Sequence, residues 1–348
     1  MEITTLRLLG IAIGLVIVLI AFLRLRTHTV QRIDVWFFLA VGLSSISIGF
    51  SPELINIPSE ILFVSKFPGF RIITIFIILV CLLVLLLFRE RAKSYVRDRN
   101  FDKLFRSVAT QKVLSLSDKY SVDSIMILLP AYNEAENIPH ILPKIPKLIH
   151  DRPVVPVVID DGSSDDTCSI AENYQAIVIK HPFNMGGGVA LRTGYDVANI
   201  ISAQVVVTMD ADGQHQPDEI SQLVLPIIEK NADIVIGSRF LGHRVPDSKI
   251  RLLGIHTFNM IIKFLSGKNV TDCTSGFRAF KVETLKKFKL IQDQYHTAEL
   301  IIEALKRKID VVEVPITVTK RIAGKSKKGT NIKYGIGFLR SVVKTWFR

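Results

Sequence analysis

The sequence contains little cysteine, and its cysteines are far apart. Its 348 residues include three, Cys81, Cys168 and Cys273, and none forms a C-x-x-C pair. Neither a disulfide framework nor a structural zinc site is therefore supported, and a reducing compartment fits. Glycine and proline, with 20 and 14 residues, are near their average shares, and 22% of residues are charged. This composition excludes collagen-like, low-complexity and disordered chains, and the length suggests about two domains.

The chain has fewer acidic than basic residues, and it is also rich in apolar residues. There are 32 Asp and Glu against 44 Lys and Arg, a net charge of +12, while 49% of residues are hydrophobic. The apolar residues concentrate in three runs with almost no charge inside them: Leu8–Leu23, Val35–Phe50 and Ile72–Phe88. A membrane-spanning helix needs about 20 residues, so each run must borrow flanking residues that snorkel, such as Arg7, Arg24 and Arg71.

We predict a transmembrane region over residues 1–90, with spans at about 8–24, 34–51 and 71–88. The alternative is three buried helices of a soluble domain, but these would need a large partner core. Basic residues gather in the first loop and again after the third run, in the juxtamembrane linker 91–123. The positive-inside rule places both segments in the cytoplasm and the N-terminus outside. The spans could also recruit a membrane partner.

From about residue 124 the pattern changes to short β-branched runs that alternate with amphipathic stretches. The expected strands are Ile125–Leu129, Val154–Ile159, Ala176–Ile179, Val205–Met209 and Ile234–Gly237. The expected helices are Glu136–His150, Asp165–Tyr174, Gly188–Ile201 and Asp218–Lys230. This alternation predicts an α/β domain over 124–330, with a mostly parallel sheet covered on both faces. In such sheets the ligand crevice lies beyond the carboxyl ends of the strands.

Carboxylates follow three of the predicted strands. The segments concerned are Pro130–Asn137, Asp160–Asp165 and Asp210–His215. An Asp-Gly pair is usually a turn, and a lone D-x-D is common by chance. Three acidic strand ends in one domain are costly, however, unless a cation or a donor-rich ligand sits among them. The oxygens of Asp210, Asp212 and Gln214 would suit Mg²⁺ or Mn²⁺, which are often shared with a ligand's phosphates.

Fixed positive charge lies further along the chain. Gly237–Arg239, Asp272–Arg278 and Arg321–Lys327 combine Arg or Lys with small residues. Arg binds phosphate with two parallel hydrogen bonds and Lys binds it as a point charge. The last segment by itself could be a solvated basic loop. Together with the acidic strand ends, these segments indicate a diphosphate held by metal on one side and cations on the other.

On these motifs the segment from Ile125 to about Lys328 resembles a family 2 glycosyltransferase of GT-A fold, of the dolichol- or polyprenyl-phosphate mannose and glucose synthase type. The resemblance implies nucleotide binding by the first motif, base contact by Asp161 and phosphate binding by Arg239. It implies a metal motif spanning Asp210, Ala211, Asp212 and Gln214. The remaining implied residues are Pro130, Tyr132 and Glu134 in the first motif, Arg321, Gly324, Ser326 and Lys327 in the basic loop, and Asn184, Gly186 and Gly188 in a turn.

Three positions depart from the family pattern. Gly187 stands where a basic residue is common, Lys308 where glycine is common before the last strand, and Cys273 where proline is frequent. None of them touches the metal motif. They therefore bear more on the substrate than on the activity.

The resemblance implies an inverting transfer of one hexose, mannose or glucose, from a GDP- or UDP-sugar to a polyprenyl or dolichyl phosphate at the cytoplasmic face. It implies Mg²⁺ or Mn²⁺ as cofactor, with Asp212, Arg239, Arg321 and Lys327 supporting the reaction. Processive synthases carry a Q-x-x-R-W motif, which is absent here, where the only tryptophans are Trp36 and Trp346. Single-sugar transfer is thus favoured.

Two alternatives stay open. One is an enzyme that glycosylates a hydroxyl of a membrane lipid or cell-surface glycan, which needs a general base. Glu299 could serve, although a surface glutamate is the more ordinary interpretation, and His215 and His296 are more often structural. The other alternative is a catalytically silent membrane anchor or partner-recruiting subunit, against which the intact acidic and basic motifs argue.

The C-terminal residues 331–348 form a basic amphipathic segment. Lys333, Arg340, Lys344 and Arg348 recur on one helical face, and apolar residues on another. We predict a helix that lies on an anionic membrane surface. The alternative is a helix that packs on the core with a solvated basic face. Nucleic-acid binding would also explain the charge, but the metal motif and the apolar runs argue against it.

The predicted orientation has a direct test. A tag at residue 1 should be cleaved by protease added outside intact cells, because the N-terminus is expected to face out. A tag that is shielded under those conditions would contradict the orientation.

Overall fold

The structure, a computed structural model, describes residues 123–245, 249–324 and 331–347, the stretch 99–111, and scattered positions before and just after that stretch. The chain divides into two compact units, Met1–Arg97 and Asp98–Arg348. Among the described residues, no helix has the length and hydropathy that a membrane crossing requires. Most of the three predicted spans lies outside the described residues, as do Ser326 and Lys327.

The first unit is described at only a few positions. Helical residues occur at 14–19 and 39–44. These two stretches approach closely, since a Cβ on Gly42 would lie 3.0 Å from the carbonyl oxygen of Gly14. A Cβ on Gly14 would lie 2.7 Å from the carbonyl oxygen of Gly42, so a larger residue there would require the contact to shift.

The second unit is built on one sheet with the strand order β2-β3-β1-β5-β7-β6-β8, and β4 pairs with β3. The strands are β1 (Ile125–Ala131), β2 (Leu148–Ile149), β3 (Arg152–Asp160), β4 (Ile177–Lys180), β5 (Val205–Thr208), β6 (Ile234–Arg244), β7 (Arg278–Lys281) and β8 (Val311–Val318). The pairs β1–β3, β1–β5, β3–β4 and β6–β8 are parallel. The predicted α/β class with a mostly parallel sheet is confirmed.

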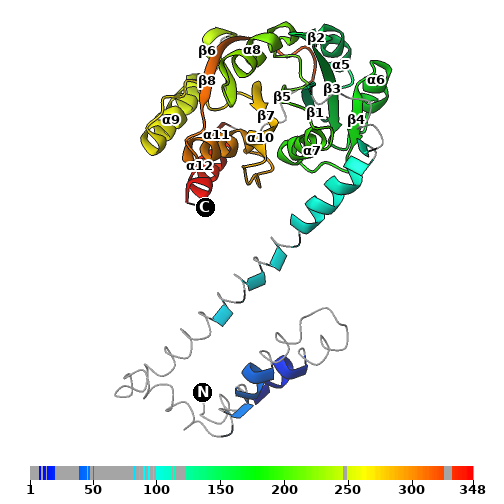
Figure 1. The fold of residues 1–348 in the computed structure, drawn as a ribbon. Coiled ribbons are helices and arrows are strands. Elements are labelled where there is room, and N and C mark those ends of the chain that lie inside the picture. The colour runs from blue at the N-terminus through cyan, green and yellow to red at the C-terminus, as the bar shows by residue number, and fades with distance from the viewer. Residues whose placement is uncertain are drawn as a thin grey trace. The chain divides into compact units, whose positions relative to one another are not determined.

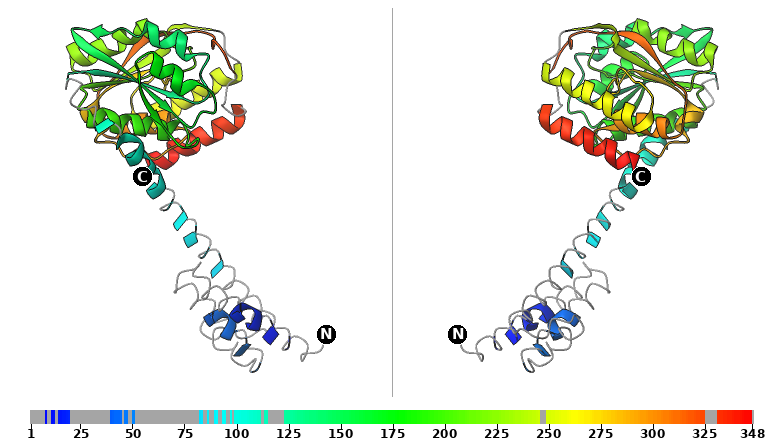
Figure 2. Two further views of the ribbon diagram at one scale, coloured as in Figure 1. Left: turned by 90° about the vertical axis from the view of Figure 1, so that its right-hand side faces the viewer. Right: turned by 90° about the vertical axis from the view of Figure 1, so that its left-hand side faces the viewer.

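Helices cover both faces of this sheet (Figures 1 and 2). Along β1, Met126 and Leu128 join one hydrophobic layer while Ile127 and Leu129 join the other, because successive side chains point to opposite faces. One layer includes α7 (Gly187–Ile200), α9 (Lys249–Ser266), α10 (Val282–Leu285), α11 (His296–Lys306) and α12 (Asn331–Trp346). The other includes α5 (Ile138–Ile141), α6 (Thr167–Asn173) and α8 (Ile220–Lys230).

Two predictions about the elements are wrong. The expected helix Glu136–His150 ends early: α5 is followed by the 3₁₀ helix η3 (Leu142–Lys144) and then by β2. Pro139, Pro143 and Pro146 explain this, because proline lacks the N–H that continues a helix and clashes with the preceding turn. The second difference is β7, which pairs antiparallel with both β5 and β6 and which strand–helix alternation did not predict.

The C-terminal helix α12 packs one face into the core. Phe338 and Val342 are buried, and the ring of Phe338 lies 4.3 Å from that of Phe258 on α9. The core-packing alternative therefore describes this face correctly. Leu339 and Val343 point outward together with Arg340 and Lys344, so α12 also presents an exposed face that is both apolar and basic.

Lys308 occupies a backbone conformation that favours glycine. Its φ is +55°, in the left-handed region, just after α11. The amide of Lys308 donates to the carbonyl of Leu305, and the amide of Ile309 donates to the carbonyl of Ala304. These two hydrogen bonds form the Schellman motif that commonly ends helices, with the left-handed residue usually a glycine. The family's preference for glycine at this position thus has a conformational reason.

Lys308→Gly should stabilise the protein by about 1 kcal/mol, because glycine removes the cost of a Cβ in the left-handed region. The readout is the thermal midpoint of the full chain. Asp310→Gly is the control, since Asp310 is exposed and has no positive φ. A lower midpoint for Lys308→Gly would contradict this account.

Candidate active site

The carboxyl ends of β1, β3 and β5 lie side by side. Ala131 is level with Asp160, and Leu128 is level with Thr208. Beyond the ladder, the amide of Asp161 donates to the carbonyl of Ala131 (2.8 Å), and that of Met209 donates to Leu128 (3.0 Å). The acidic segments that follow these strands therefore meet at one edge of the sheet, as the sequence predicted.

The first motif and the loop after β3 hold each other in place. The amide of Glu134 donates to Thr167 Oγ1 (2.9 Å), and that of Ala135 donates to Asp165 Oδ2 (3.1 Å). Asn133, with φ +52°, accepts the amide of Ser164 (2.8 Å). Burial acts to raise the pKa of Asp165, but the hydrogen bonds from Thr167 and Ala135 outweigh it and hold this pKa below its usual value.

Asp161, the expected base contact, is a buried anchor for the turn at 184–188. Its Oδ1 accepts the amide of Met185 (2.9 Å) and contacts Nδ1 of His181 (2.8 Å), and its Oδ2 accepts the amide of Gly186 (2.7 Å). Gly186 has φ +97°, which only glycine adopts readily. Asp161 thus shapes the turn that the family pattern matched at Asn184, Gly186 and Gly188.

Arg321 links two acidic segments that are far apart in the sequence. Its Nη2 lies 2.7 Å from Asp212 Oδ2, and its Nη1 lies 3.7 Å from Glu134 Oε1. Asn137 donates to Glu134 Oε2 (2.5 Å) and accepts the amide of Ala323 (3.0 Å). The structure therefore brings the first motif, the metal motif and the basic loop together. Lys327 of that loop lies outside the described residues.

The turn at 210–214 presents oxygen ligands. Asp212 is nearly buried, and its Oδ1 accepts the amide of Gln214 (3.1 Å). The side-chain nitrogen of Gln214 donates to the carbonyl of Thr319 (3.2 Å), and Ala211 is buried between the two aspartates. Asp210 lies so close to Gly276 that a Cβ there would be 2.9 Å from its Oδ1.

The donor set of this turn fits a hard divalent cation. Among the described residues no group of three or more His, Cys, Asp or Glu side chains could hold a metal ion. Magnesium commonly takes only one or two carboxylates from the protein and completes its shell with water and substrate phosphates. Asp210 and Asp212 supply two carboxylates, two positions apart in the sequence, and this number agrees with a metal shared with a diphosphate.

Arg239 forms an ion pair within the protein. Its Nε donates to Asp272 Oδ2 (2.6 Å), and Nη2 lies 3.4 Å from Thr274 Oγ1. Asp272 is fully buried, so this ion pair fixes the direction of the guanidinium. Pro130 lies in β1, and Tyr132 follows that strand with a half-buried side chain.

Glu299 differs from its expected place on the surface. It is fully buried, and its Oε2 accepts the amides of Ile291 and Gln292, each at 2.8 Å. A carboxylate that satisfies two backbone donors is a structural anchor and is poorly placed to take a proton from a substrate. His215 is buried with its ring 5.0 Å from that of Phe277, in agreement with a structural role.

Sequence reasoning missed several residues that organise the site. His181 is buried and bridges Asp161 to Thr193, with 2.9 Å between Nε2 and Oγ1. Asn137 was noted only as the end of the first motif, although it joins Glu134 to Ala323. For His181 the available signal was its position just after a predicted strand. Neither partner could be inferred from spacing, because Asn137 and Ala323 are 186 positions apart.

With this geometry established, comparison with known proteins identifies the family. Residues 126–288 match the family described as glycosyl transferase family 2. A polyprenol monophosphomannose synthase of Mycolicibacterium smegmatis is 35% identical over 60% of this chain and 82% of the relative. A UDP-N-acetylglucosamine–dolichyl-phosphate N-acetylglucosaminyltransferase of Methanococcus voltae is 34% identical over 61% of this chain and 91% of the relative. The chain belongs to glycosyl transferase family 2.

Solved structures support the fold assignment. The chain resembles glucosyl-3-phosphoglycerate synthase from Mycobacterium tuberculosis in complex with phosphoglyceric acid, with a TM-score of 0.53 and 20% identity over 65% of this chain and 80% of that one. Another structure of that enzyme, in complex with Mn²⁺, UDP-glucose and phosphoglyceric acid, gives the same TM-score, identity and coverage. At this identity the likeness concerns the fold alone.

Cys168 offers a test of the local electrostatics, because it donates to Asp160 Oδ2 (2.8 Å). Burial, and then the Asp160 carboxylate, raise the pKa of Cys168 to about 12. Alkylation at pH 8 should therefore be about a thousandfold slower than for an ordinary thiol of pKa 8.5. Asp160→Asn should lower the thiol pKa and speed the reaction, followed by mass spectrometry of the Cys168 peptide. Equal rates in the two proteins would contradict the assigned effect of Asp160.

Proposed function

We propose that this protein transfers a single hexose, mannose or glucose, from a GDP- or UDP-sugar to a polyprenyl or dolichyl phosphate, with inversion at the anomeric carbon. The observation that carries the proposal is the Arg321 bridge between Glu134 and Asp212. It gathers acidic and basic groups at the strand ends. A bound nucleoside diphosphate would use both, the carboxylates to hold its metal ion and the cations to bind its phosphates. Two relatives above 30% identity bear names of enzymes that glycosylate polyprenol or dolichyl phosphate, which supports the acceptor class.

A divalent metal ion is part of the proposal. Asp210 and Asp212, with Gln214 beside them, would hold Mg²⁺ or Mn²⁺, as solved structures of glucosyl-3-phosphoglycerate synthase contain one or the other with UDP. When bound, the metal would neutralise charge on the departing diphosphate. Arg321 would move its guanidinium from Asp212 toward the phosphates, and Arg239 would add a positive charge of fixed direction. Lys327 is proposed to contribute to the same cluster.

The choice of acceptor follows from acid–base chemistry. A lipid monophosphate has a second pKa of about 6, so at pH 7 it is mostly a dianion and needs little help from a base. A sugar or lipid hydroxyl does need a base. Glu299, the carboxylate considered for that role, is buried and bonded to two backbone amides. Its position therefore favours the phosphate acceptor over the hydroxyl alternative.

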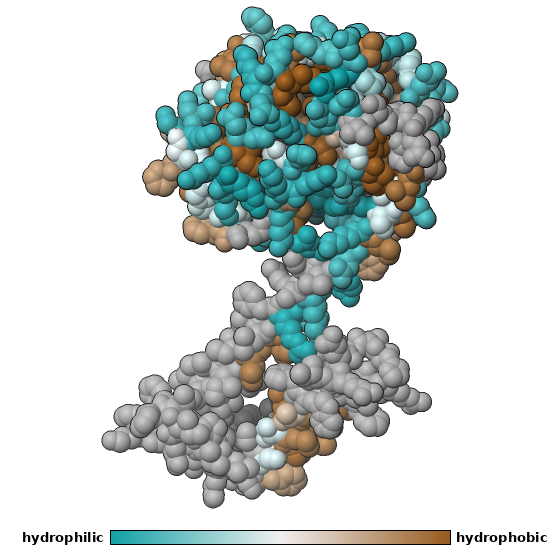
Figure 3. Space-filling view, in the orientation of Figure 1, coloured by the Kyte–Doolittle hydropathy of each residue, from teal (hydrophilic) through white to brown (hydrophobic). Residues whose placement is uncertain are grey.

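A membrane location is part of the proposal. The face of the second unit turned to the viewer in Figure 3 is mainly hydrophilic. Helices α9 and α12, which pack together, instead expose a set of large apolar side chains: Leu253, Met260, Phe264, Leu339 and Val343. Exposed Lys263, Arg340 and Lys344 lie among them. Apolar side chains interleaved with cations suit an anionic, cytoplasmic membrane surface, and the N-terminal spans would anchor the chain there.

Asp212→Ala should reduce transfer at least about a hundredfold, because it removes both a metal ligand and the partner of Arg321. The assay uses the purified full chain, labelled GDP- and UDP-hexoses, polyprenyl phosphate and Mg²⁺ or Mn²⁺. Mild acid should release the sugar from the lipid product, as a phosphate-linked sugar is acid-labile whereas a glycosylated hydroxyl is stable.

The matched control is Asp218→Ala, an exposed aspartate in the 3₁₀ helix η4 (Pro217–Glu219), which should keep full activity. Full activity of Asp212→Ala would refute the proposal, and so would the absence of a lipid-linked sugar with every donor tried. An acid-stable product would favour the hydroxyl acceptor instead.

A further inference from the structure

A helix that precedes the sheet in the sequence is docked on the catalytic domain. Residues 99–111, here called the linker helix, belong to the same compact unit as the sheet. Nε and Nη2 of Arg106 both donate to Asp196 Oδ2 on α7, at 2.9 and 2.6 Å. Thr110 of this helix is buried, and so is Val113 just beyond it, which belongs to the hydrophobic layer that includes α7. The helix is therefore held by both charge and apolar packing.

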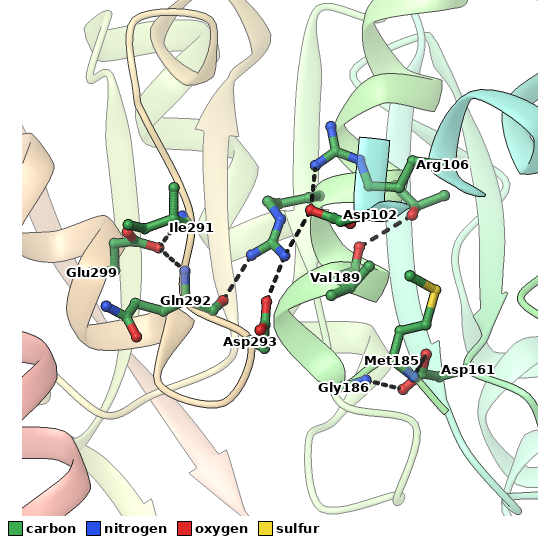
Figure 4. A network of polar contacts seen from close by, with 12 residues as sticks. Asp102, Arg106, Asp161, Met185, Gly186, Val189, Ile291, Gln292, Asp293 and Glu299 are labelled. Carbon is green, nitrogen blue, oxygen red and sulfur yellow. Dashed lines mark hydrogen bonds and ion pairs between the residues drawn. The ribbon is translucent and has the colours of Figure 1, made fainter. Parts of the chain in front are cut away.

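One side of the linker helix reaches the end of residues 183–188, a segment that consists of the loop before α7 and the first two residues of that helix and is here called the donor loop. Arg192 on α7 donates to Asp102 Oδ2 (3.2 Å), to Asp293 Oδ1 (2.6 Å) and to the carbonyl of Gln292 (2.9 Å). The carbonyl of Asp293 in turn accepts the amide of Gly188 (2.7 Å). Figure 4 shows Gln292 and Asp293 on their loop alongside Asp102 and Arg106. A chain of polar contacts thus runs from the linker helix to Gly188.

The same helix also contacts the beginning of the donor loop. The ring of Phe105 meets that of Phe183 edge to face, with 5.3 Å between centroids. The backbone after Phe183 lies so close to Gly162 that a Cβ there would be 2.7 Å from the amide nitrogen of Asn184. Between these two ends, the amides of Met185 and Gly186 donate to Asp161. The linker helix consequently braces both ends of the loop whose middle is fixed to Asp161.

We propose that the linker helix sets the conformation of the donor loop and thereby the affinity for the nucleoside diphosphate of the donor. Phe105 and Arg106 act as positioning residues in this arrangement. The inference rests on the proposed function and on the family resemblance, which implies that Asp161 contacts the nucleotide.

The test uses the full chain in detergent and the variants Arg106→Ala and Phe105→Ala. We expect each to raise the dissociation constant for GDP or UDP, and the KM for the sugar donor, at least about fivefold. The kcat should change less than about twofold, because neither residue touches the reacting atoms. Amide hydrogen exchange at Met185 and Gly186 should become faster. Lys103→Ala is the control, since it removes an exposed cation from the same helix.

Two further variants separate positioning from a general loss of structure. Arg106→Lys keeps the charge opposite Asp196 and should restore part of the affinity. The double variant Arg106→Ala/Asp196→Ala should bind nucleotide about as well as the weaker of the two single variants, because both remove the same ion pair. These comparisons also cover the case in which one alanine variant fails to fold.

Unchanged nucleotide affinity and unchanged exchange in the folded variants would overturn the inference while leaving the proposed function intact. An equal loss in Lys103→Ala would overturn it as well. If the wild-type chain binds neither GDP nor UDP, the proposed function fails. Hydrogen exchange of the donor loop then decides by itself whether the linker helix sets its conformation.

Discussion

The organisation of this domain depends on buried carboxylates at the ends of parallel strands. Asp160, Asp161 and Asp212 are almost completely removed from water, which is costly unless each is given donors. Asp160 and Asp161 are satisfied by backbone amides, a histidine and a thiol, whereas Asp212 faces the guanidinium of Arg321. The first two therefore fix the loops, while Asp212 joins the amide of Gln214 to the guanidinium of Arg321, a cation whose place at the carboxylate a metal ion could take.

Glu299 follows the same principle at a distance from the strand ends. Its carboxylate anchors the loop that carries Gln292 and Asp293, and this loop supports Gly188 and is held by Arg192. Three segments, the linker helix, α7 and the 291–293 loop, are thus joined by charged groups that lie around the donor loop. Ion pairs in partly buried positions are directional and specify one arrangement of the segments, even where their net contribution to stability is small.

The sequence predicted much of the fold because local patterns determine it. Buried β-branched runs indicated the strands β1, β3, β4 and β5, and most of the expected helices begin and end within a few residues of the observed ones. Two elements were predicted wrongly, and each has its own cause. Three prolines end the helix expected over 136–150, and the short antiparallel β7 lies outside any regular alternation. The family resemblance also indicated glycine at Lys308, whose left-handed φ gives the reason.

The sequence by itself determined the class of the domain, the acidic strand ends and the cations available to meet them. Only the tertiary structure decided which cation meets which carboxylate: Arg321 faces Asp212 and Glu134, whereas Arg239 is held by Asp272. It also decided that Glu299 is buried and that the linker helix braces the donor loop. The physical reason is that strand and helix periodicity depends on neighbours in the sequence. The pairing of charges depends on loops that are distant in the sequence. These loops come together only when the helices pack on the two faces of the sheet.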